Sequence, residues 1–436
     1  MKSTLAVAAT ALAAVLAGAP AFACAEAHNY TTKTPYAPQQ SPRQYEPAPR
    51  GFAPIFTENV ARHGSRAMSD SKDGDAVLAA LATGQARHAL TELGAELGPQ
   101  VQALLAGAQT IGYGNLSGRG RREQAQTAQR LERRLPSLFD TIVAQQEPIE
   151  VLTSGVTRAT DSANAFTGGL TAGDPALASL IQAPVTNKDL LYFHKQPQNA
   201  AYQQYVASDP DLHAVLARID GLPQTSSAAA RVVSRIFAPP YVAAMSDGDR
   251  IAFARSLFEL SSAAPGLAVE AAGVDLDPFM SDADAQWFAY LDDAEEFYEK
   301  GPAFAGRSIT YDMASVLLND LFAQVDNKIN NRIAYGAVLR FTHAEEVIPL
   351  AVLLGLPGST TPAVTTYRYA NNPWRGASVA PMGANIQWDV YAGHGRHLVR
   401  MLYNERETAF KSGCRPIKPR SYFYDFDELR RCYAIA

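Results

Sequence analysis

The chain of 436 residues has only three cysteines, and two of them, Cys414 and Cys432, lie near its C-terminus. So few cysteines exclude a disulfide-stapled miniprotein and argue against a cysteine-rich zinc site. Beyond residue 16 there is no apolar run of the roughly 18 residues that a transmembrane helix needs. The formal net charge of −5 argues against a general nucleic-acid-binding protein. With 47% hydrophobic residues, the chain can bury a large globular core.

The N-terminus has the pattern of a secretory signal peptide. Lys2 precedes an apolar stretch at 5–16 and a small-residue cleavage site that ends at Ala23. We therefore predict a signal peptide at residues 1–23 and a secreted or periplasmic mature protein. Lipoprotein anchoring through Cys24 is less favoured, because the leucine expected three positions upstream is absent. Export permits disulfides, and we expect a bridge between Cys414 and Cys432.

Apolar periodicity predicts an α/β fold with a central mixed sheet, flanking helices and a mostly helical inserted cap domain. Expected strands are 52–61, 149–153, 333–341 and a hairpin of 385–391 with 398–404. Residues 76–106 are expected to form helices broken at Gly84 and Gly98. The predicted α/β core comprises 26–185 plus 331–436, and the predicted insertion is 186–330.

The charge is unevenly distributed along the chain. Residues 275–299 contain nine acids and no Lys or Arg, and without these acids the net charge changes from −5 to +4. Residues 119–134 contain six Arg. The simplest interpretation of both segments is solvated helix faces. The total charge nevertheless conceals a basic remainder, so it does not exclude a polyanionic ligand.

Polar clusters follow three of the predicted structural elements, where α/β proteins place active sites. The first is 62–66, in which His63 lies between Arg62 and Arg66. These cations disfavour imidazolium, so His63 should be neutral and nucleophilic, and the guanidinium groups suit phosphate oxygens. A surface basic turn is the alternative interpretation.

The other two clusters are 153–162 and 342–346. Arg158 precedes a predicted helix, whose N-terminus is a natural anion site, although such an arginine is usually solvated. His343 and Glu345 lie between a predicted strand and a helix. A carboxyl that faces a bound anion has a raised pKa and can act as a general acid. Simple capping of the helix would explain the same acidic first turn.

Together the Arg-His-Gly-Ser-Arg motif at 62–66, the lone Arg158 and His343-Ala344-Glu345 resemble the histidine acid phosphatases, branch two of the histidine phosphatase superfamily. The His-Ala-Glu form is similar to the multiple inositol polyphosphate phosphatases, a phytase-active subgroup. The resemblance extends to 32–36, 114–120 and 403–405. Met68 departs from it, because many members have proline there.

The resemblance implies a phosphomonoesterase that uses a phosphohistidine intermediate. His63 would be the nucleophile and Glu345 the proton donor. Arg62, Arg66, Arg158 and His343 would hold the phosphoryl oxygens. It implies no metal or other cofactor and a small phosphate ester as partner, such as phytate or a lower inositol phosphate. The other phosphates are expected to meet basic residues of the flanking segments, for which Lys33, Lys72 and Arg119 are candidates.

Three alternatives remain open at this point. A broad-specificity acid phosphatase could use the same groups on small esters. A secreted phosphate-ester-binding protein could have kept the fold and lost turnover. A metal-dependent hydrolase could use His343 and Glu345 with His394 and His397, although no His-Glu-x-x-His motif occurs. A serine hydrolase is disfavoured because there is no Gly-x-Ser-x-Gly motif.

Overall fold

The computed structural model describes residues 30–435, so the predicted signal peptide and Cys24 lie outside the described residues. Within that range eight strands form one mixed sheet in the order β3-β2-β4-β1-β5-β6-β7, with β8 also paired to β6. The strands are β1 (Ala53–Arg62), β2 (Ile149–Thr153), β3 (Val185–Thr186), β4 (Ala337–Thr342), β5 (Asn385–Gly393), β6 (Arg396–Tyr403), β7 (Arg406–Thr408) and β8 (Phe423–Asp425). β5 and β6 form the predicted hairpin.

The three parallel strands β2, β4 and β1 end at the same edge of the sheet. Arg62 at the end of β1 is paired with Thr342 at the end of β4, and Thr153 at the end of β2 is paired with Phe341. The three polar clusters of the sequence follow these strand ends. The topology therefore brings them together at one edge.

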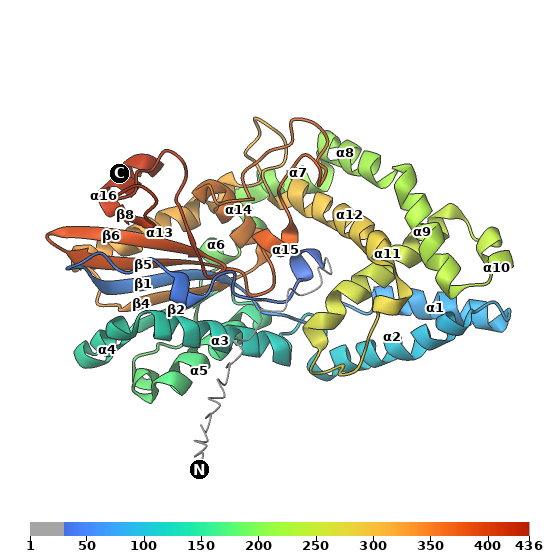
Figure 1. Ribbon diagram of the computed structural model, residues 1–436, viewed down its shortest axis with the longest axis horizontal. Helices are drawn as coiled ribbons and strands as arrows, with labels where there is room; N and C mark the ends of the chain where they lie inside the picture. The colour runs from blue at the N-terminus through green and yellow to red at the C-terminus, as the bar shows by residue number, and fades with distance from the viewer. Residues whose placement is uncertain (1–29, 436) are drawn as a thin grey trace, which may run out of the picture.

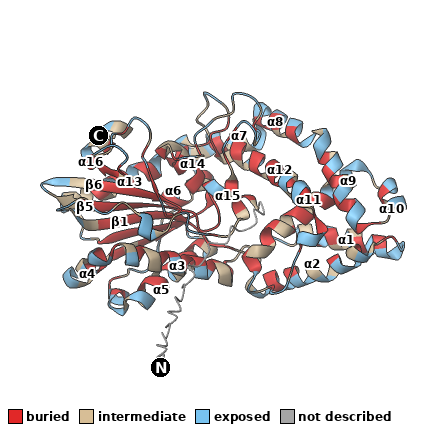
Figure 2. Cartoon of the chain, in the orientation of Figure 1, coloured by how far each residue is buried: buried red, intermediate tan, exposed pale blue. Residues whose placement is uncertain are grey.

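Helices cover both faces of the sheet (Figure 1). One face carries α3 (Gly118–Arg134), α4 (Pro136–Gln145) and α5 (Thr157–Gly173), and the other carries α6 (Lys188–Leu191), α13 (Ser315–Ile329), α14 (Ala344–Leu354) and α16 (Phe426–Tyr433). Side chains alternate along a strand, so Ala61 packs in the core of the first face and Val60 in that of the second. Figure 2 shows the strands as the most continuously buried part of the molecule. The predicted fold is confirmed.

A second, helical region lies beside the sheet (Figure 1). It contains α1 (Lys72–Ala86), α2 (Glu92–Ile111), α7 (Ala200–Ser208), α8 (Pro210–Asp220), α9 (Pro223–Ile236), α10 (Pro239–Ala244), α11 (Asp247–Ala263) and α12 (Asp282–Lys300). Most of these helices come from the predicted insertion. However, α1 and α2 precede β2 in sequence and pack against α11 and α9. The domain boundaries themselves stay a prediction.

The predicted helix breaks at Gly84 and Gly98 are both misplaced, because α1 continues through Gly84 to Ala86 and α2 continues through Gly98 and Pro99. The break lies between them, where His88 has a positive φ of 53° and Thr91 caps α2 by accepting a hydrogen bond from the Gly94 N–H. Pro99 removes one helical hydrogen bond, but the packing of α2 against α1 and α9 maintains the helix.

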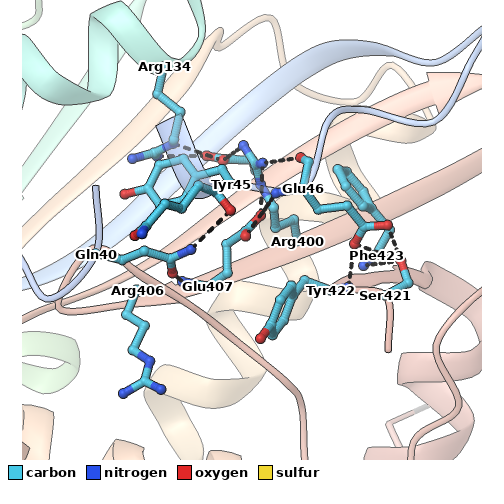
Figure 3. A network of polar contacts seen from close by, with 12 residues as sticks. Gln40, Tyr45, Glu46, Arg134, Arg400, Arg406, Glu407, Ser421, Tyr422 and Phe423 are labelled. Atoms are coloured by element: carbon cyan, nitrogen blue, oxygen red, sulfur yellow. Dashed lines mark hydrogen bonds and ion pairs between the residues drawn. The ribbon is translucent and has the colours of Figure 1, made fainter. Parts of the chain in front are cut away.

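A polar network ties the extended N-terminal segment before β1 to strands β5, β6 and β7 (Figure 3). The Glu46 N–H donates to both carboxylate oxygens of Glu407 at 2.9 Å, and Arg400 pairs with Glu407 at 3.2 Å and with Asp389 at 2.9 Å. Ser421 donates to Glu46. These contacts fix the extended segment, whose upstream end reaches the site described below.

The C-terminal segment contains a disulfide between Cys414 and Cys432, as predicted. It joins the loop before β8 to α16. Across residues 30–435, no helix combines the length and the apolar character that crossing a membrane would require.

Candidate active site

The first motif forms a buried loop directly after β1. His63 is 2% exposed, and its backbone N–H donates to the Thr342 carbonyl at 2.9 Å. Its ring Nδ1 lies 2.9 Å from the Gly64 carbonyl oxygen. Because a carbonyl only accepts, Nδ1 carries the proton of the neutral ring and Nε2 keeps a lone pair. Burial, and then the charge of Arg62, hold the pKa of His63 well below its ordinary value, so the ring is neutral as expected.

The start of α3 packs against this loop. A Cβ at Gly120 would lie 2.2 Å from the Ser65 carbonyl oxygen, so only glycine fits there. The Ser117 hydroxyl donates to the same oxygen at 3.0 Å. Buried Glu123 accepts from both the N–H and the hydroxyl of Ser65 at 2.8 Å. The 114–120 motif therefore supports the loop that carries His63, and Glu123 is a supporting residue that the sequence analysis missed.

Three arginines surround His63 closely enough to lower its pKa. Arg62 is 5% exposed and donates to the carbonyls of Thr32 and Ala380, each at 2.5 Å. Burial, and then Arg158 and Arg62, lower the pKa of Arg66 to about 10. The cations are therefore held together against their mutual repulsion, which an anion would relieve.

The third motif meets the second across the sheet edge. His343 is the N-cap of α14, and its Nε2 lies 2.9 Å from the hydroxyl oxygen of Ser154. Its ring centroid lies 5.4 Å from that of His63. Burial, and then Arg158, lower the pKa of His343 to about 3, so the ring is neutral at neutral pH. Ser154 belongs to the predicted 153–162 cluster, but its contact with His343 was not foreseen.

Four buried nitrogen atoms of this cluster have no hydrogen-bond partner among the described residues. They are Nε of Arg62, Nε of Arg66, Nε of Arg158 and Nδ1 of His343. Unpaired buried polar atoms are costly and call for an explanation, such as a ligand. The predicted catalytic residues His63, Arg62, Arg66, Arg158 and His343 are thus brought together into a site suited to an anion.

A second buried pair supports the third motif. Glu346 is fully buried; its Oε1 lies 2.5 Å from His194 Nδ1, and its Oε2 accepts from the Thr342 hydroxyl at 2.9 Å. The Tyr192 ring centroid lies 4.7 Å from that of His194 and 5.2 Å from that of His343. No motif marks η4 (Phe193–Lys195), which supplies His194, and the sequence suggested only a dipole role for Glu346.

Glu345 lies in the first turn of α14 with its side chain 30% exposed. Its Oε1 lies 3.6 Å from Nζ of Lys300, the last residue of α12. Burial alone would raise the pKa of Glu345, but Lys300, His194 and His343 bring it below the usual range. The side chains around Glu345 thus oppose the predicted rise in its pKa. Lys300 was not a sequence candidate.

The acidic segment is not a solvated face throughout. Asp284 and Asp293 of α12 are almost completely buried, at 1% and 0% exposed. Asp292 forms an ion pair with Lys33 at 3.4 Å, and Glu296 forms one with Lys300 at 2.8 Å. The expectation of solvated faces is therefore wrong for these four residues. Asp292 and Glu296 are counter-ions of Lys33 and Lys300, Asp284 pairs with Arg231 of α9, and Asp293 accepts hydrogen bonds from the Tyr369 hydroxyl and the Gly376 N–H.

The same correction applies to part of the arginine-rich segment on α3. Arg134 is 3% exposed and pairs with buried Asp389 at 2.9 Å. Arg130 pairs with buried Glu405 at 2.7 Å. Asp389 comes from β5 and Glu405 from the turn between β6 and β7, pairings that local sequence patterns could not reveal.

The three predicted substrate-binding residues differ in their surroundings. Lys33 and Lys72 line one cavity of about 310 Å³ together with Arg66 and Glu259. Lys33 also pairs with Glu259 at 3.1 Å, whereas Lys72 is largely exposed and pairs with Asp70. Arg119 donates to the Pro265 carbonyl at 3.0 Å and lies 3.5 Å from Glu123.

The histidines of the alternative metal site do not approach His343. His394 is at the β5–β6 turn, where its ring packs against Phe52. The strand register places Ala392 opposite Ala53, at the start of β1, whereas His63 follows the end of β1. Among residues 30–435, no three or more His, Cys, Asp or Glu side chains are grouped to hold a metal ion.

The chain matches the histidine phosphatase superfamily (branch 2) over residues 56–177 and 270–404, more than half of its length. It is similar to the multiple inositol polyphosphate phosphatase of Bifidobacterium longum in complex with inositol hexasulfate, with a TM-score of 0.87, 32% identity and coverage of 94% of this chain and 98% of that one. The complex of that protein with phosphate gives the same values.

The phytase from D. castellii shares the fold, with a TM-score of 0.64 at 14% identity and coverage of 93% of this chain and 84% of that one. No match was found among curated proteins. The chain belongs to branch 2 of the histidine phosphatase superfamily, and it is an enzyme of that family resembling the multiple inositol polyphosphate phosphatases.

Proposed function

We propose that this protein hydrolyses inositol polyphosphates such as phytate through a phosphohistidine on His63. The observation that carries the proposal is the set of four buried nitrogen atoms without partners on Arg62, Arg66, Arg158 and His343. A phosphoryl group offers oxygen acceptors for the three arginine donors, and for Nδ1 of His343 in the tautomer that carries the proton there. Its negative charge would also offset the repulsion among the arginines.

The tautomer of His63 defines the first step. Its Nδ1–H is held by the Gly64 carbonyl, so Nε2 attacks phosphorus. As the N–P bond forms, the P–O ester bond breaks, and its electron pair goes to the leaving oxygen. Glu345, when protonated, gives its proton to that oxygen. The arginines and His343 hold the phosphoryl oxygens and stabilise their charge in the transition state.

The second step returns the enzyme to its starting state. Water attacks phosphorus, the N–P bond breaks, and the electron pair returns to His63 Nε2. The Glu345 carboxylate accepts a proton from the attacking water and is protonated again. Phosphate then leaves. Since three arginines provide the positive charge, we expect a chelator such as EDTA to leave phosphate release unchanged, and its abolition would contradict the scheme.

The substrate class is supported by similarity and by the cavity beside Arg66. The B. longum protein was solved with inositol hexasulfate. Here Lys33 and Lys72 line a cavity that also includes Arg66, so a second phosphate on the same ring could reach them. Arg119 is retained as a third candidate because it lies at the start of α3, next to the nucleophile loop.

A broad-specificity acid phosphatase is the second candidate, and one observation favours it. The cavity of Lys33 and Lys72 is also lined by Asp70, Asp73 and Glu259, which disfavour additional phosphates. The ratio of kcat/KM for phytate to that for an aryl phosphate distinguishes the two. A ratio well above one supports inositol polyphosphates, whereas a ratio well below one supports small esters.

The decisive experiment for enzymatic function measures phosphate release from phytate by the wild type, His63→Ala and Glu345→Gln. Both variants are expected to lose activity. Equal release by all three would leave a phosphate-ester-binding protein as the better account.

We also propose that the protein is exported. The N-terminal sequence pattern and the Cys414–Cys432 disulfide support this. N-terminal sequencing of the mature protein tests it: a start at or soon after Cys24 is expected, and a retained Met1 would contradict it. Mass spectrometry would reveal a lipid on Cys24.

A further inference from the structure

The last turn of α12 places a buried ammonium group beside the proposed proton donor. Lys300 is 13% exposed, and its Nζ lies 2.8 Å from Oε1 of Glu296 and 3.6 Å from Oε1 of Glu345. Glu296 lies on the same helix, whereas Glu345 comes from α14 on the sheet. One cation therefore connects the helical region to the third motif, with a closer contact to Glu296 than to Glu345.

Other charged or titratable groups also face Glu345 from the elements around it. They are Glu296 and Glu299 on α12, Tyr202 on α7, His194 on η4, Arg62 at the end of β1, Arg66 in the loop after it, and His343 and Glu346 around the start of α14. Of the basic side chains around Glu345, Lys300 is the one that forms an ion pair with it among the described residues. Arg62 and Arg66 are the proposed phosphate ligands.

We propose that Lys300 is a positioning residue that holds the Glu345 carboxylate and stabilises its charge when its proton is transferred, and that Glu296 moderates this effect. The inference rests on the proposed function. When Glu345 gives its proton to the leaving oxygen, a carboxylate forms 3.6 Å from an ammonium group. The ion pair favours that product of the proton transfer and makes Glu345 a stronger acid.

The same contact limits the fraction of Glu345 that is protonated before the reaction. The pKa of Glu345 is below its usual range, with Lys300 the largest of the lowering causes. The negative charge of a bound phosphoryl group next to Glu345 opposes this lowering of the pKa. Glu296 also opposes the lowering, because Glu296 binds Lys300 more closely than Glu345 does and adds negative charge near Glu345.

These roles predict pH shifts of opposite sign for two substitutions. A general acid loses activity as the pH rises through its pKa, so that pKa sets the alkaline limb of kcat/KM. Lys300→Met removes the cation, raises the pKa of Glu345 and moves the limb to higher pH by about one unit. Glu296→Gln removes a negative charge, lowers that pKa and moves the limb to lower pH.

The experiment measures kcat/KM for phytate against pH in the wild type, Lys300→Met, Lys300→Arg and Glu296→Gln. Titration of the substrate is common to all four. Lys300→Arg should retain the wild-type limb because it keeps the charge. Lys328→Met is the matched control: Lys328 is also largely buried and pairs with Glu147 at 2.7 Å, between α13 and the α4–β2 loop. Its profile should keep its shape.

Opposite shifts for Lys300→Met and Glu296→Gln support the proposal. If both variants only lose activity with unshifted limbs, or if Lys300→Met raises KM alone, Lys300 is structural or a phosphate ligand and the proposal fails. The activity of Glu345→Gln distinguishes failure of this proposal from failure of the proposed function. If Glu345→Gln is inactive, Glu345 stays the proposed proton donor whatever the Lys300 variants show. If Glu345→Gln is fully active, the proposed function on which this inference rests fails.

Discussion

At the residue scale, the side chains around His63 differ in charge state although they share one buried site. Burial keeps the rings of His63 and His343 neutral, while the guanidinium groups remain available for an anion. Neutral imidazole with a free Nε2 is the form needed for attack on phosphorus. The sequence predicted the neutral state of His63 alone, because cations on both sides of a histidine disfavour imidazolium; the burial that also keeps His343 neutral comes from the fold.

The role of Glu345 can be tested with leaving groups of different acidity. An alkyl alcohol such as inositol needs a proton as it leaves, whereas 4-nitrophenolate does not. We expect Glu345→Gln to slow phytate hydrolysis by about 10²–10⁴-fold, with a much smaller effect on enzyme phosphorylation by 4-nitrophenyl phosphate. Measurement of single-turnover rates for both esters checks this. An equal loss on both would show that Glu345 is not the proton donor.

The residues that sequence analysis missed share a physical reason. Lys300, His194 and Glu123 carry no local motif, and each meets the site through contacts between segments distant in sequence. Their roles depend on packing that a local pattern does not specify. The motif residues were predictable because they follow strand ends, and parallel strands bring such positions to one edge.

At the element scale, the close approach of α3 to the loop that carries His63 explains why residue 120 of the 114–120 motif is glycine. Gly64 and Gly120 face each other: a Cβ at Gly64 would lie 2.6 Å from the Gly120 carbonyl oxygen. Ser117 caps the N-terminus of α3 at this contact, and its hydroxyl donates to the Ser65 carbonyl. The start of α3 therefore also supports the loop that carries His63.

This contact predicts the effect of Gly120→Ala. The added methyl group would displace the Ser65 backbone, so we expect a loss of about 1–3 kcal/mol of stability together with a loss of kcat. Gly168→Ala on α5 is the control, since a Cβ at Gly168 has no atom within 4 Å. It should be neutral or stabilising by up to about 1 kcal/mol. Urea unfolding and phosphate release measure both effects, and equal behaviour of the two variants would contradict the packing argument.

The sequence predicted the type of most elements but not all of their limits. β2 has the predicted limits, whereas the strand expected from residue 333 begins at Ala337. α2 continues through Gly98 and Pro99 because packing against other helices outweighs local propensity.

At the scale of the whole molecule, the acidic and basic segments each find some of their counter-ions elsewhere in the fold. Asp292 and Glu296 of α12 pair with Lys33 and Lys300 beside the site. Arg130 and Arg134 of α3 pair with Glu405 and Asp389. The net charge of −5 therefore says little about the ligand. We expect the local electrostatic field at the arginine cluster, rather than the net charge, to determine which ligand binds there.

The disulfide contributes to stability rather than to the site. It closes a loop of 18 residues in sequence and ties α16 to the loop before β8. Replacement of both Cys414 and Cys432 by Ser should reduce the free energy of unfolding by about 3 kcal/mol, with kcat for phytate unchanged below the unfolding transition. Urea denaturation followed by fluorescence checks this. A loss of kcat without a change in stability would contradict it.

The central claim is that His63 becomes phosphorylated during turnover. The direct measurement is rapid acid-free quenching of the enzyme with ³²P-labelled phytate, followed by peptide mapping. The account predicts an acid-labile, alkali-stable label on the peptide that contains His63, formed as fast as the first turnover and absent in His63→Ala. Full turnover with no label on that peptide, or a label that persists in His63→Ala, would contradict it.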